Sequence, residues 1–266
     1  MKGICKLCKN EREIRQSHVI PEFMYQNVYD QNPKKYYHLD INTGAEEKSK
    51  SKILQKGVRE YLLCDNCEGK LSKWERYTAN FFYSKTKGNT AYLKDKLMTA
   101  DGYKIYVWAN VEYDFLKLFL MSLLWRLIIS KGYATHDVEA TLSEKLRLAI
   151  LTENPLGYDE FGCLLQVLYY PDGKKAGKII LAPYVTKGAS GNILNIFIDG
   201  FLFSFYLNSE GATAEQKEFF LNEQGNIQMI GRQALEDPIL RDKLTAALEF
   251  FKTFKDVFDK EDPRHK

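Results

Sequence analysis

The feature that most constrains this chain is a pair of Cys-x-x-Cys motifs near its N-terminus. Cys5 and Cys8 form the first pair, Cys64 and Cys67 form the second, and only one further cysteine occurs in the 266 residues. Two residues between cysteines let both thiolates reach one metal ion from a tight turn, and two such turns complete the tetrahedron that structural zinc prefers. The sequence therefore predicts one structural Zn²⁺ held by these four thiolates.

The alternative is that the two pairs are redox-active or incidental, and the expected compartment bears on the choice. No apolar leader follows Met1, and the most apolar stretch, residues 115–129, contains Lys117 and Arg126. That stretch falls short of the roughly 20 residues that a membrane span needs. We therefore expect a cytoplasmic protein without a membrane segment, and in that compartment disulfides are rare and paired cysteines favour metal.

The patterns along the front of the chain predict a small module built around the cysteines. Residues 1–20 are polar and turn-like, and Pro21 is placed to open a short amphipathic helix. Residues 31–58 are polar and lysine-rich, which is typical of a loop or a weak hairpin. Apolar residues at spacings of three and four from Glu68 onward predict a helix that Gly88 and Asn89 end.

The rest of the sequence contains both helical and strand patterns, so the chain as a whole is predicted to be an α+β protein. Helices are expected over residues 113–131, 141–152 and 237–259. Strands of a mostly antiparallel sheet are expected over residues 103–108, 161–170, 178–184, 193–198 and 201–207. Asp199-Gly200 between two of these strands is a two-residue hairpin signal. We divide the chain into a zinc-binding module at 1–85, with an inserted loop at 31–58, and an α+β domain of unassigned fold at 86–266.

Some apolar and charged residues of both parts have simple expected places. Trp74 and Trp125 lie on apolar faces and are expected in the core, and Cys163 lies in an apolar strand as an inert core cysteine. Arg126 lies inside the most apolar helix, where an unpaired charge is costly. We expect its partner to be a carboxylate from the C-terminal half of the chain.

The charge is divided unequally. Residues 1–100 hold 19 Lys and Arg against 12 Asp and Glu, whereas residues 101–266 hold 19 against 23. A basic front part is what a module that binds a polyanion such as nucleic acid would have, although a charge balance of this size over a hundred residues is also common without such a partner. Lysines of the insert, with Tyr36 and Tyr37 among them, are suited to phosphates and unpaired bases, although a solvated loop with the same residues is equally compatible. These lysines are Lys34, Lys35, Lys48, Lys50, Lys52 and Lys56.

The front of the chain has three motifs in a fixed order, CKLC at 5–8, SHVIP at 17–21 and REYLLCDNCE at 59–68. This order is CxxC, then a histidine followed closely by a proline, then an apolar approach to a second CxxC that starts a helix. It resembles the pattern of the HNH, or ββα-metal, endonucleases that carry a four-cysteine zinc site. The resemblance covers about residues 1–85, implies a treble-clef, HNH-like zinc module there and leaves the remaining residues without a named fold.

The resemblance implies a metal-dependent endonuclease that hydrolyses phosphodiester bonds. In such enzymes the histidine is the general base that takes a proton from the attacking water, and one divalent ion, Mg²⁺ or Mn²⁺, stabilises the developing charge. By position the base is His18, while the zinc holds the frame and takes no part in the chemistry. The implied substrate is nucleic acid, with DNA favoured over RNA, and the implied setting is bacterial defence or a mobile element.

The motif departs from the family pattern at three positions. Ser17 stands where an acidic residue commonly precedes the histidine, Arg59 stands at the position of the middle asparagine, and Glu68 follows the last cysteine in place of Asn or His. Glu68 is then the candidate oxygen ligand for a catalytic metal, with Glu60 a weaker one. Arg59 is a candidate phosphate contact, because a planar guanidinium binds phosphate well.

These departures keep two other functions open. One is a non-catalytic zinc module that binds nucleic acid or a protein partner, in which His18 is structural or an alternative zinc ligand. The other is a regulatory protein that binds a partner through its C-terminal domain and uses the front only as a structural element. His38 is a further candidate ligand in the nuclease interpretation. Loss of cutting in His18→Ala distinguishes the nuclease from both.

Overall fold

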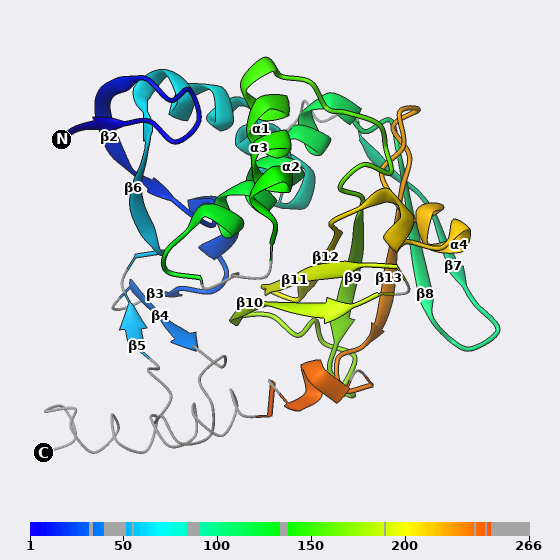
Figure 1. Cartoon of the computed structure of the whole chain (residues 1–266). Helices are drawn as coiled ribbons and strands as arrows, with labels where there is room; N and C mark the ends of the chain where they lie inside the picture. The colour runs from blue at the N-terminus through cyan, green and yellow to red at the C-terminus, as the bar shows by residue number, and fades with distance from the viewer. Residues whose placement is uncertain are drawn as a thin grey trace, which may run out of the picture.

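The structure is a computed structural model of the chain. It describes residues 1–31, 34–39, 52–54, 56–83, 91–133, 138–188, 190–236, 238–242 and 244–245, and only the backbone over 30–39 and 52–54. Figure 1 shows a small N-terminal sheet on one side, the helices α1, α2 and α3 beside it, and a large sheet beyond them. Within the described ranges, no helix combines the length and the apolar character needed to cross a membrane.

The small sheet consists of three antiparallel strands in the order β1 (Lys2–Ile4), β2 (Glu11–His18) and β6 (Arg59–Cys64). The expectation that residues 1–20 are turn-like is thus wrong outside the cysteine turn. The reason is that β2 buries mainly Ile14 and Ser17 and exposes most of its other side chains, so its composition hides a strand. After β2, Pro21 leads into a single 3-10 turn, η1 (Glu22–Tyr25), which is shorter than the predicted helix.

The three long helices confirm the helical patterns of the sequence. They are α1 (Asp65–Tyr83), α2 (Tyr113–Ile129) and α3 (Ala140–Thr152). Helix α1 begins directly after Cys64, three residues earlier than Glu68, and its predicted end at Gly88 and Asn89 lies outside the described residues. Its buried positions recur every three or four residues, which is the spacing of one helix face. They are Cys67, Leu71, Trp74, Thr78 and Phe81.

The large sheet has ten described strands and is mostly antiparallel, as predicted. Its order is β3-β4-β10-β11-β12-β9-β13-β8-β7, with β5 paired to β4, and the pairs β4–β10 and β9–β13 are parallel. The strands are β3 (Asp30–Gln31), β4 (Lys34–Leu39), β5 (Lys52–Leu54), β7 (Tyr92–Met98), β8 (Lys104–Ala109), β9 (Cys163–Tyr169), β10 (Ile180–Lys187), β11 (Asn192–Ile198), β12 (Phe201–Tyr206) and β13 (Ile227–Gln233). Two short turns of helix, η2 (Ser209–Gly211) and α4 (Ala214–Lys217), lie between β12 and β13.

The sequence predicts some strands and turns of this sheet and misses others. Asp199-Gly200 makes the predicted hairpin between β11 and β12, and both residues have positive φ, 47° and 81°, as a two-residue turn of this kind requires. Strands β7 and β13 were not predicted. In the insert, β4 and β5 pair as an antiparallel hairpin, which agrees with the weak hairpin expected at 31–58. Of the predicted last helix, residues 238–242 and 244–245 are helical, and the rest lies outside the described residues.

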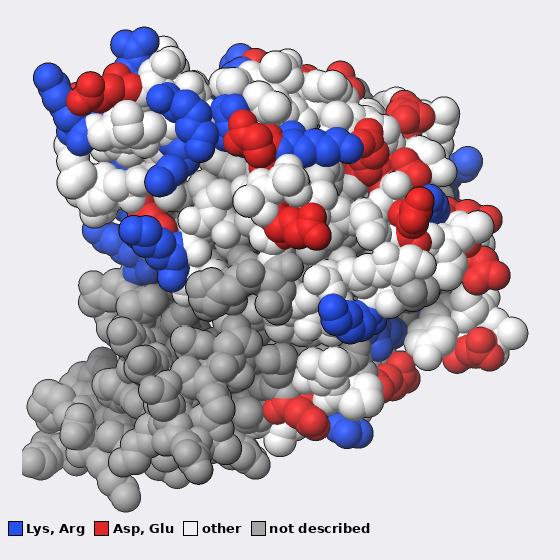
Figure 2. Space-filling model, in the orientation of Figure 1, with Lys and Arg blue, Asp and Glu red and all other residues white. Residues whose placement is uncertain are grey.

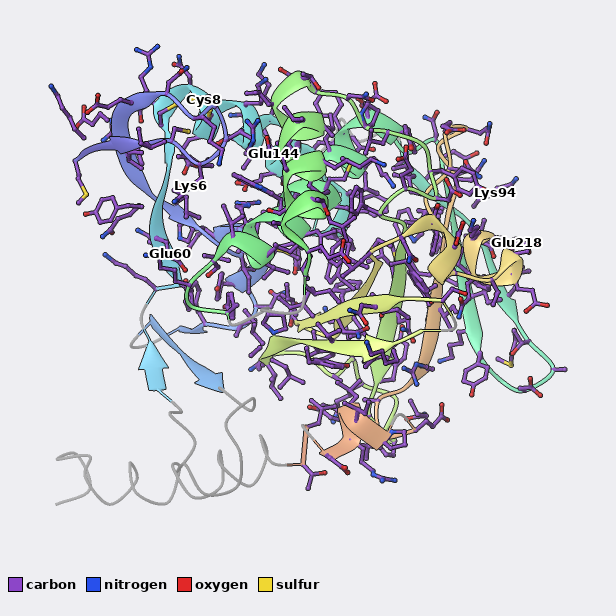
Figure 3. The ribbon with its side chains drawn as sticks, in the orientation of Figure 1. Lys6, Cys8, Glu60, Lys94, Glu144 and Glu218 are labelled. Atoms are coloured by element: carbon purple, nitrogen blue, oxygen red, sulfur yellow. The ribbon has the colours of Figure 1, made fainter. Side chains whose placement is uncertain are left out.

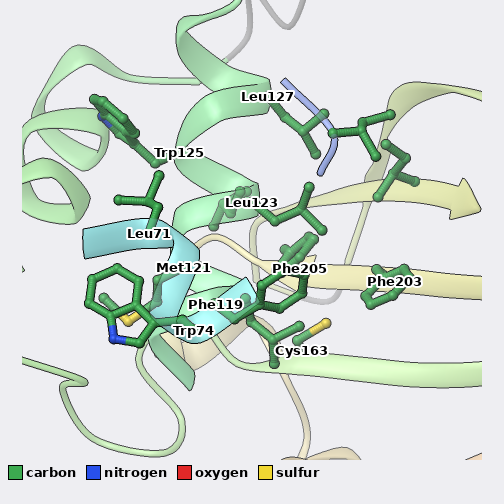
Figure 4. Packing of buried hydrophobic residues seen from close by; sticks show 14 of the residues in the cluster. Leu71, Trp74, Phe119, Met121, Leu123, Trp125, Leu127, Cys163, Phe203 and Phe205 are labelled. Carbon is green, nitrogen blue, oxygen red and sulfur yellow. The ribbon is translucent and has the colours of Figure 1, made fainter. Parts of the chain in front are cut away.

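The main hydrophobic core lies between α1, α2 and the large sheet. Figure 4 shows Trp74 of α1, Trp125 of α2 and Phe205 of β12 among the side chains that fill it. Trp74, Trp125 and Cys163 are buried as expected. Helix α2 is buried on nearly every side, and Lys117 within it donates to the backbone carbonyls of Tyr158 and Glu160 at 3.1 and 2.6 Å. The boundary between a module at 1–85 and a domain at 86–266 stays a prediction.

Candidate metal centre and charged cluster

The four cysteines come together at one end of the small sheet. Cys5 and Cys8 lie in the turn between β1 and β2, Cys64 ends β6, and Cys67 lies in the first turn of α1. The structure thus confirms a small N-terminal sheet that carries a four-cysteine cluster, and the treble-clef assignment of this module stays a prediction. Figure 3 labels Cys8 in this turn. The ligands therefore come from two segments that are more than fifty residues apart in the chain but adjacent in the sheet.

The distances between the sulfur atoms fit a tetrahedral zinc site. All four Sγ atoms lie within 4.8 Å of one another, and Cys8 Sγ lies 4.0 Å from Cys64 Sγ. Zinc–sulfur bonds of about 2.3 Å place the corners of a tetrahedron roughly 3.8 Å apart. The donor set is four thiols, which is the set of a closed structural site rather than of a catalytic zinc. The cysteines are thus positioned to bind one structural Zn²⁺.

The protonation of the cysteines also favours a cation. Burial raises the pKa of Cys5, but backbone N–H groups, including that of Cys64 at 3.4 Å from its sulfur, outweigh burial and lower the pKa to about 7. Burial and the neighbouring sulfur atoms raise the pKa of Cys67. Without a cation, the thiol of Cys67 therefore keeps its proton near neutral pH, in conflict with a site of four thiolates. A bound Zn²⁺ removes this conflict, because it stabilises every thiolate it coordinates.

Hydrogen bonds attach the cysteine turn to the rest of the molecule. Lys6 N donates to Leu62 O of β6 at 2.8 Å, and Lys9, which has a φ of 62°, closes the turn by donating to Cys5 O at 2.9 Å. From α3, the guanidinium of Arg147 donates to Leu7 O and to Glu144. The metal turn is therefore fixed to both β6 and α3.

A second group of polar side chains lies at the opposite end of β2 and on the facing side of α1. We call it the charged cluster, and its members are Ser17, His18, Glu22, Arg59, Glu68, Glu75 and Arg126. It contains the three residues that the sequence singled out beside the cysteines, namely His18, Arg59 and Glu68. Its members come from β2, η1, β6, α1 and α2.

His18 has two partners at one nitrogen atom. Residues His18 and Arg59 are cross-strand neighbours of β2 and β6, and Arg59 Nε donates to His18 Nε2 at 2.8 Å. Glu22 Oε2 lies 2.9 Å from the same Nε2. One nitrogen cannot both accept from Arg59 and donate to Glu22. Burial, followed by the charge of Arg59, lowers the pKa of His18, so the neutral ring that accepts from Arg59 is favoured.

Glu22 is itself held in place. The hydroxyl of Tyr29 donates to both of its carboxylate oxygens, at 3.3 and 3.1 Å. Burial, and then the charge of Glu22, raises the pKa of Tyr29 to about 12, so this hydroxyl keeps its proton at neutral pH. These two hydrogen bonds hold the carboxylate of Glu22 beside the imidazole of His18.

Glu68 occupies the first turn of α1. Burial raises the pKa of its carboxyl group, against a hydrogen bond with Ser17 and the charge of Arg126, which lower it. Its Oε1 is buried and has no hydrogen-bond partner among the described residues. Because a buried carboxylate oxygen without a partner is costly, this atom is suited to a cation or a donor that binds from outside the chain.

Arg126 connects the cluster to the core. It is only 2% exposed, donates from Nη1 to Glu75 Oε1 at 2.8 Å and to His18 O at 3.1 Å, and donates from Nε to Ser122 O at 3.2 Å. The expectation that a carboxylate of the C-terminal half pairs with Arg126 is therefore wrong. The partner lies on α1, two helical turns after Glu68 and on the same helix face, which is a spacing that the sequence displays.

Other candidates from the sequence do not join the cluster. Glu60 accepts from the hydroxyl of Ser130 and from the backbone N–H groups of Lys131 and Gly132, at 3.1 and 2.9 Å for the latter two. It therefore holds the segment after α2 instead of facing a metal. The side chains of His38 and of the lysines at 34–52 lie outside the described residues. Sequence reasoning missed Glu22 and Glu75, although Glu22 is four residues from His18 and follows Pro21.

Among the described residues, the four cysteines are the one group of three or more potential ligands that could hold a metal ion. Comparison of the chain with protein-family models, with characterised proteins and with solved structures finds no match. The resemblance to HNH endonucleases therefore rests on the order of the motifs and on no overall similarity.

Proposed function

We propose that the charged cluster is the centre of a metal-dependent phosphodiesterase, with His18 as its general base and nucleic acid as its substrate. The observation that carries this proposal is the pair of contacts at His18 Nε2. A general base needs a neutral resting state and a partner for the proton it gains. Arg59 supports the first state, and Glu22 lies where it can support the second.

The proton transfer can be followed atom by atom. Arg59 has a planar guanidinium, which binds a phosphate group better than it binds a neutral imidazole. When a phosphate takes this donor, the lone pair of His18 Nε2 is freed for the attacking water. The water gives its proton to Nε2, and the resulting N–H donates to Glu22 Oε2, which already lies 2.9 Å away. The hydroxide formed attacks phosphorus, and the bond to the leaving oxygen breaks.

Two metals have separate roles in this proposal. Zinc on the four cysteines fixes β2, β6 and α1 relative to one another. A hard ion such as Mg²⁺ or Mn²⁺ stabilises the charge on the phosphate and leaving oxygen when it is bound. Glu68, whose Oε1 has no hydrogen-bond partner among the described residues, is the residue that would hold it, since such ions bind to one or two carboxylates together with substrate phosphate and water.

Cleavage of supercoiled plasmid and of single-stranded DNA, with Mg²⁺ or Mn²⁺, tests the proposal. Wild type should cut, and His18→Ala should lose at least about 100-fold in rate, because a positioned base contributes roughly 10²–10⁴. Glu68→Gln should also lose activity. Glu13→Gln is the matched control, as this carboxylate is exposed on β2. Zinc content and circular dichroism must stay unchanged in all variants. Equal cutting by wild type and His18→Ala would refute the role of His18.

A second candidate function is a non-catalytic zinc module that binds nucleic acid or a protein. It is favoured by the occupied Nε2 of His18 and by the single metal-ligand group among the described residues. In that case none of the proteins cuts with any divalent ion, and His18→Ala leaves binding unchanged.

A further inference from the structure

A groove lies next to the charged cluster, between the small sheet and the segment that follows α2. It has a volume of about 740 Å³ and opens to solvent between β1, β6 and the segment that follows α2. Its lining includes Ile4, Lys6, Arg59, Tyr61, Ile129 and Lys131. Arg59 lines this groove and also donates to His18, so the groove is connected to the proposed catalytic histidine through Arg59.

The charge of the groove is positive. Lys6 and Lys131 are exposed on it, and Arg59 supplies a third cation. Glu60 is the one acidic residue of the described lining, and three donors of the segment 130–132 satisfy its carboxylate. Figure 2 shows blue side chains on this side of the molecule, and Figure 3 labels Lys6 and Glu60 there. The groove is therefore complementary to a polyanion.

An aromatic side chain stands in the same groove. Alternate residues of a strand share a face, so Tyr61 lies on the same face of β6 as Arg59. Tyr61 is 49% exposed, although it is large and apolar, and the partly exposed Ile4 continues the apolar surface. Duplex DNA presents phosphates and base edges to a protein, whereas an unpaired base presents a flat face that stacks on an aromatic ring.

We propose that this groove binds single-stranded nucleic acid. Lys6, Arg59 and Lys131 contact its phosphates, an unpaired base stacks on Tyr61, and the strand is thereby led to His18. The inference rests on the proposed function, because it names the form of substrate that the same centre accepts. Binding in the groove does not itself require cutting, so the two claims fail separately.

The test is binding of a fluorescein-labelled 20-nucleotide single strand, and of the corresponding duplex, to the full zinc-loaded chain without added Mg²⁺ or Mn²⁺. Fluorescence anisotropy gives Kd over a range of salt concentrations. We expect tighter binding of the single strand than of the duplex. Tyr61→Ala should weaken single-strand binding about tenfold, and Tyr61→Phe should bind like wild type. Lys131→Ala should lower the slope of log Kd against log salt by about 0.7, because one phosphate contact is lost.

Two exposed residues elsewhere provide matched controls. Tyr103→Ala and Lys94→Ala remove the same side-chain types away from the groove, and Figure 3 shows Lys94 on the other side of the molecule. Both should leave Kd unchanged. Equal affinity for duplex and single strand, no binding, or an unchanged Kd in Tyr61→Ala would overturn the inference. Selective binding of the single strand without any cleavage would support the role of the groove and refute the nuclease. Cleavage that Tyr61→Ala leaves unaffected would support the nuclease and refute the role of the groove.

Discussion

The ion pair between Glu75 and Arg126 gives the most specific test of how the charged cluster is held together. Glu75→Ala leaves the guanidinium of Arg126, 2% exposed, without its carboxylate partner. Removing one partner of a buried pair costs about 3–5 kcal/mol. Two backbone acceptors, His18 O and Ser122 O, remain for Arg126, and the Glu75 side chain is 25% exposed. We therefore expect the lower end, about 3 kcal/mol.

Urea unfolding followed by circular dichroism measures this loss, with Glu13→Ala as an exposed control and zinc content measured in every variant. The double variant Glu75→Ala with Arg126→Met removes the buried charge as well as its partner. It should therefore lose less stability than the sum of the single variants, by at least about 1.5 kcal/mol. A loss under about 1 kcal/mol in Glu75→Ala, or strictly additive losses in the cycle, would show that Arg126 does not depend on Glu75.

Three further predictions concern other parts of the molecule. The pKa of His18 should lie below 6.5 in an NMR titration, rise in Arg59→Ala and fall further in Glu22→Gln; a pKa that does not respond to either variant would mean that these contacts are not made. For Lys117, burial lowers the pKa from 10.5 to about 8, so between these values the unfolded chain binds more protons and the stability contributed by this site rises with pH. Between pH 8 and pH 10.5, the free energy of unfolding should therefore rise by about 3 kcal/mol more in wild type than in Lys117→Met. Parallel curves of unfolding free energy against pH for the two proteins would contradict a buried, charged Lys117. Gly225 and Gly102 both have positive φ, but a Cβ at Gly225 would lie 2.4 Å from Val111 O, whereas a Cβ at Gly102 would meet open space. Gly102→Ala should therefore lower the free energy of unfolding by about 1–2 kcal/mol from backbone strain alone. Gly225→Ala should lower it clearly more in the same urea assay. Equal losses in the two variants would mean that Gly225 does not lie against Val111.

Features that depend on local spacing could be predicted from the sequence. The two CxxC pairs identify the metal ligands because each pair already forms a chelating turn, whatever the chain does between them. The apolar run of α2 indicates a buried helix, and Asp199-Gly200 specifies its own turn. Motif order singled out His18, Arg59 and Glu68, and the structure places all three in the charged cluster, where their catalytic roles stay a prediction.

Features that depend on distant partners could not be predicted. Strand β13 joins the sheet by pairing with β8 on one side and β9 on the other, and nothing in IQMIGRQ specifies either neighbour. Most side chains of strand β2 are exposed and polar, so its sequence does not show the apolar pattern from which strands are predicted. Arg126 required a carboxylate, but a charge requirement does not say which segment supplies it. Glu75 meets it because α1 packs against α2.

The N-terminal sheet and the proposed function depend above all on one zinc ion, which Cys5, Cys8, Cys64 and Cys67 are positioned to bind and which would fix β2, β6 and α1. X-ray absorption at the zinc edge of the purified full chain tests this directly. We expect one zinc per chain with four sulfur neighbours at about 2.3 Å, and loss of that zinc in Cys64→Ser. Protein that is folded without zinc, or a zinc shell of nitrogen and oxygen atoms, would contradict the metal centre and the proposed function built on its frame.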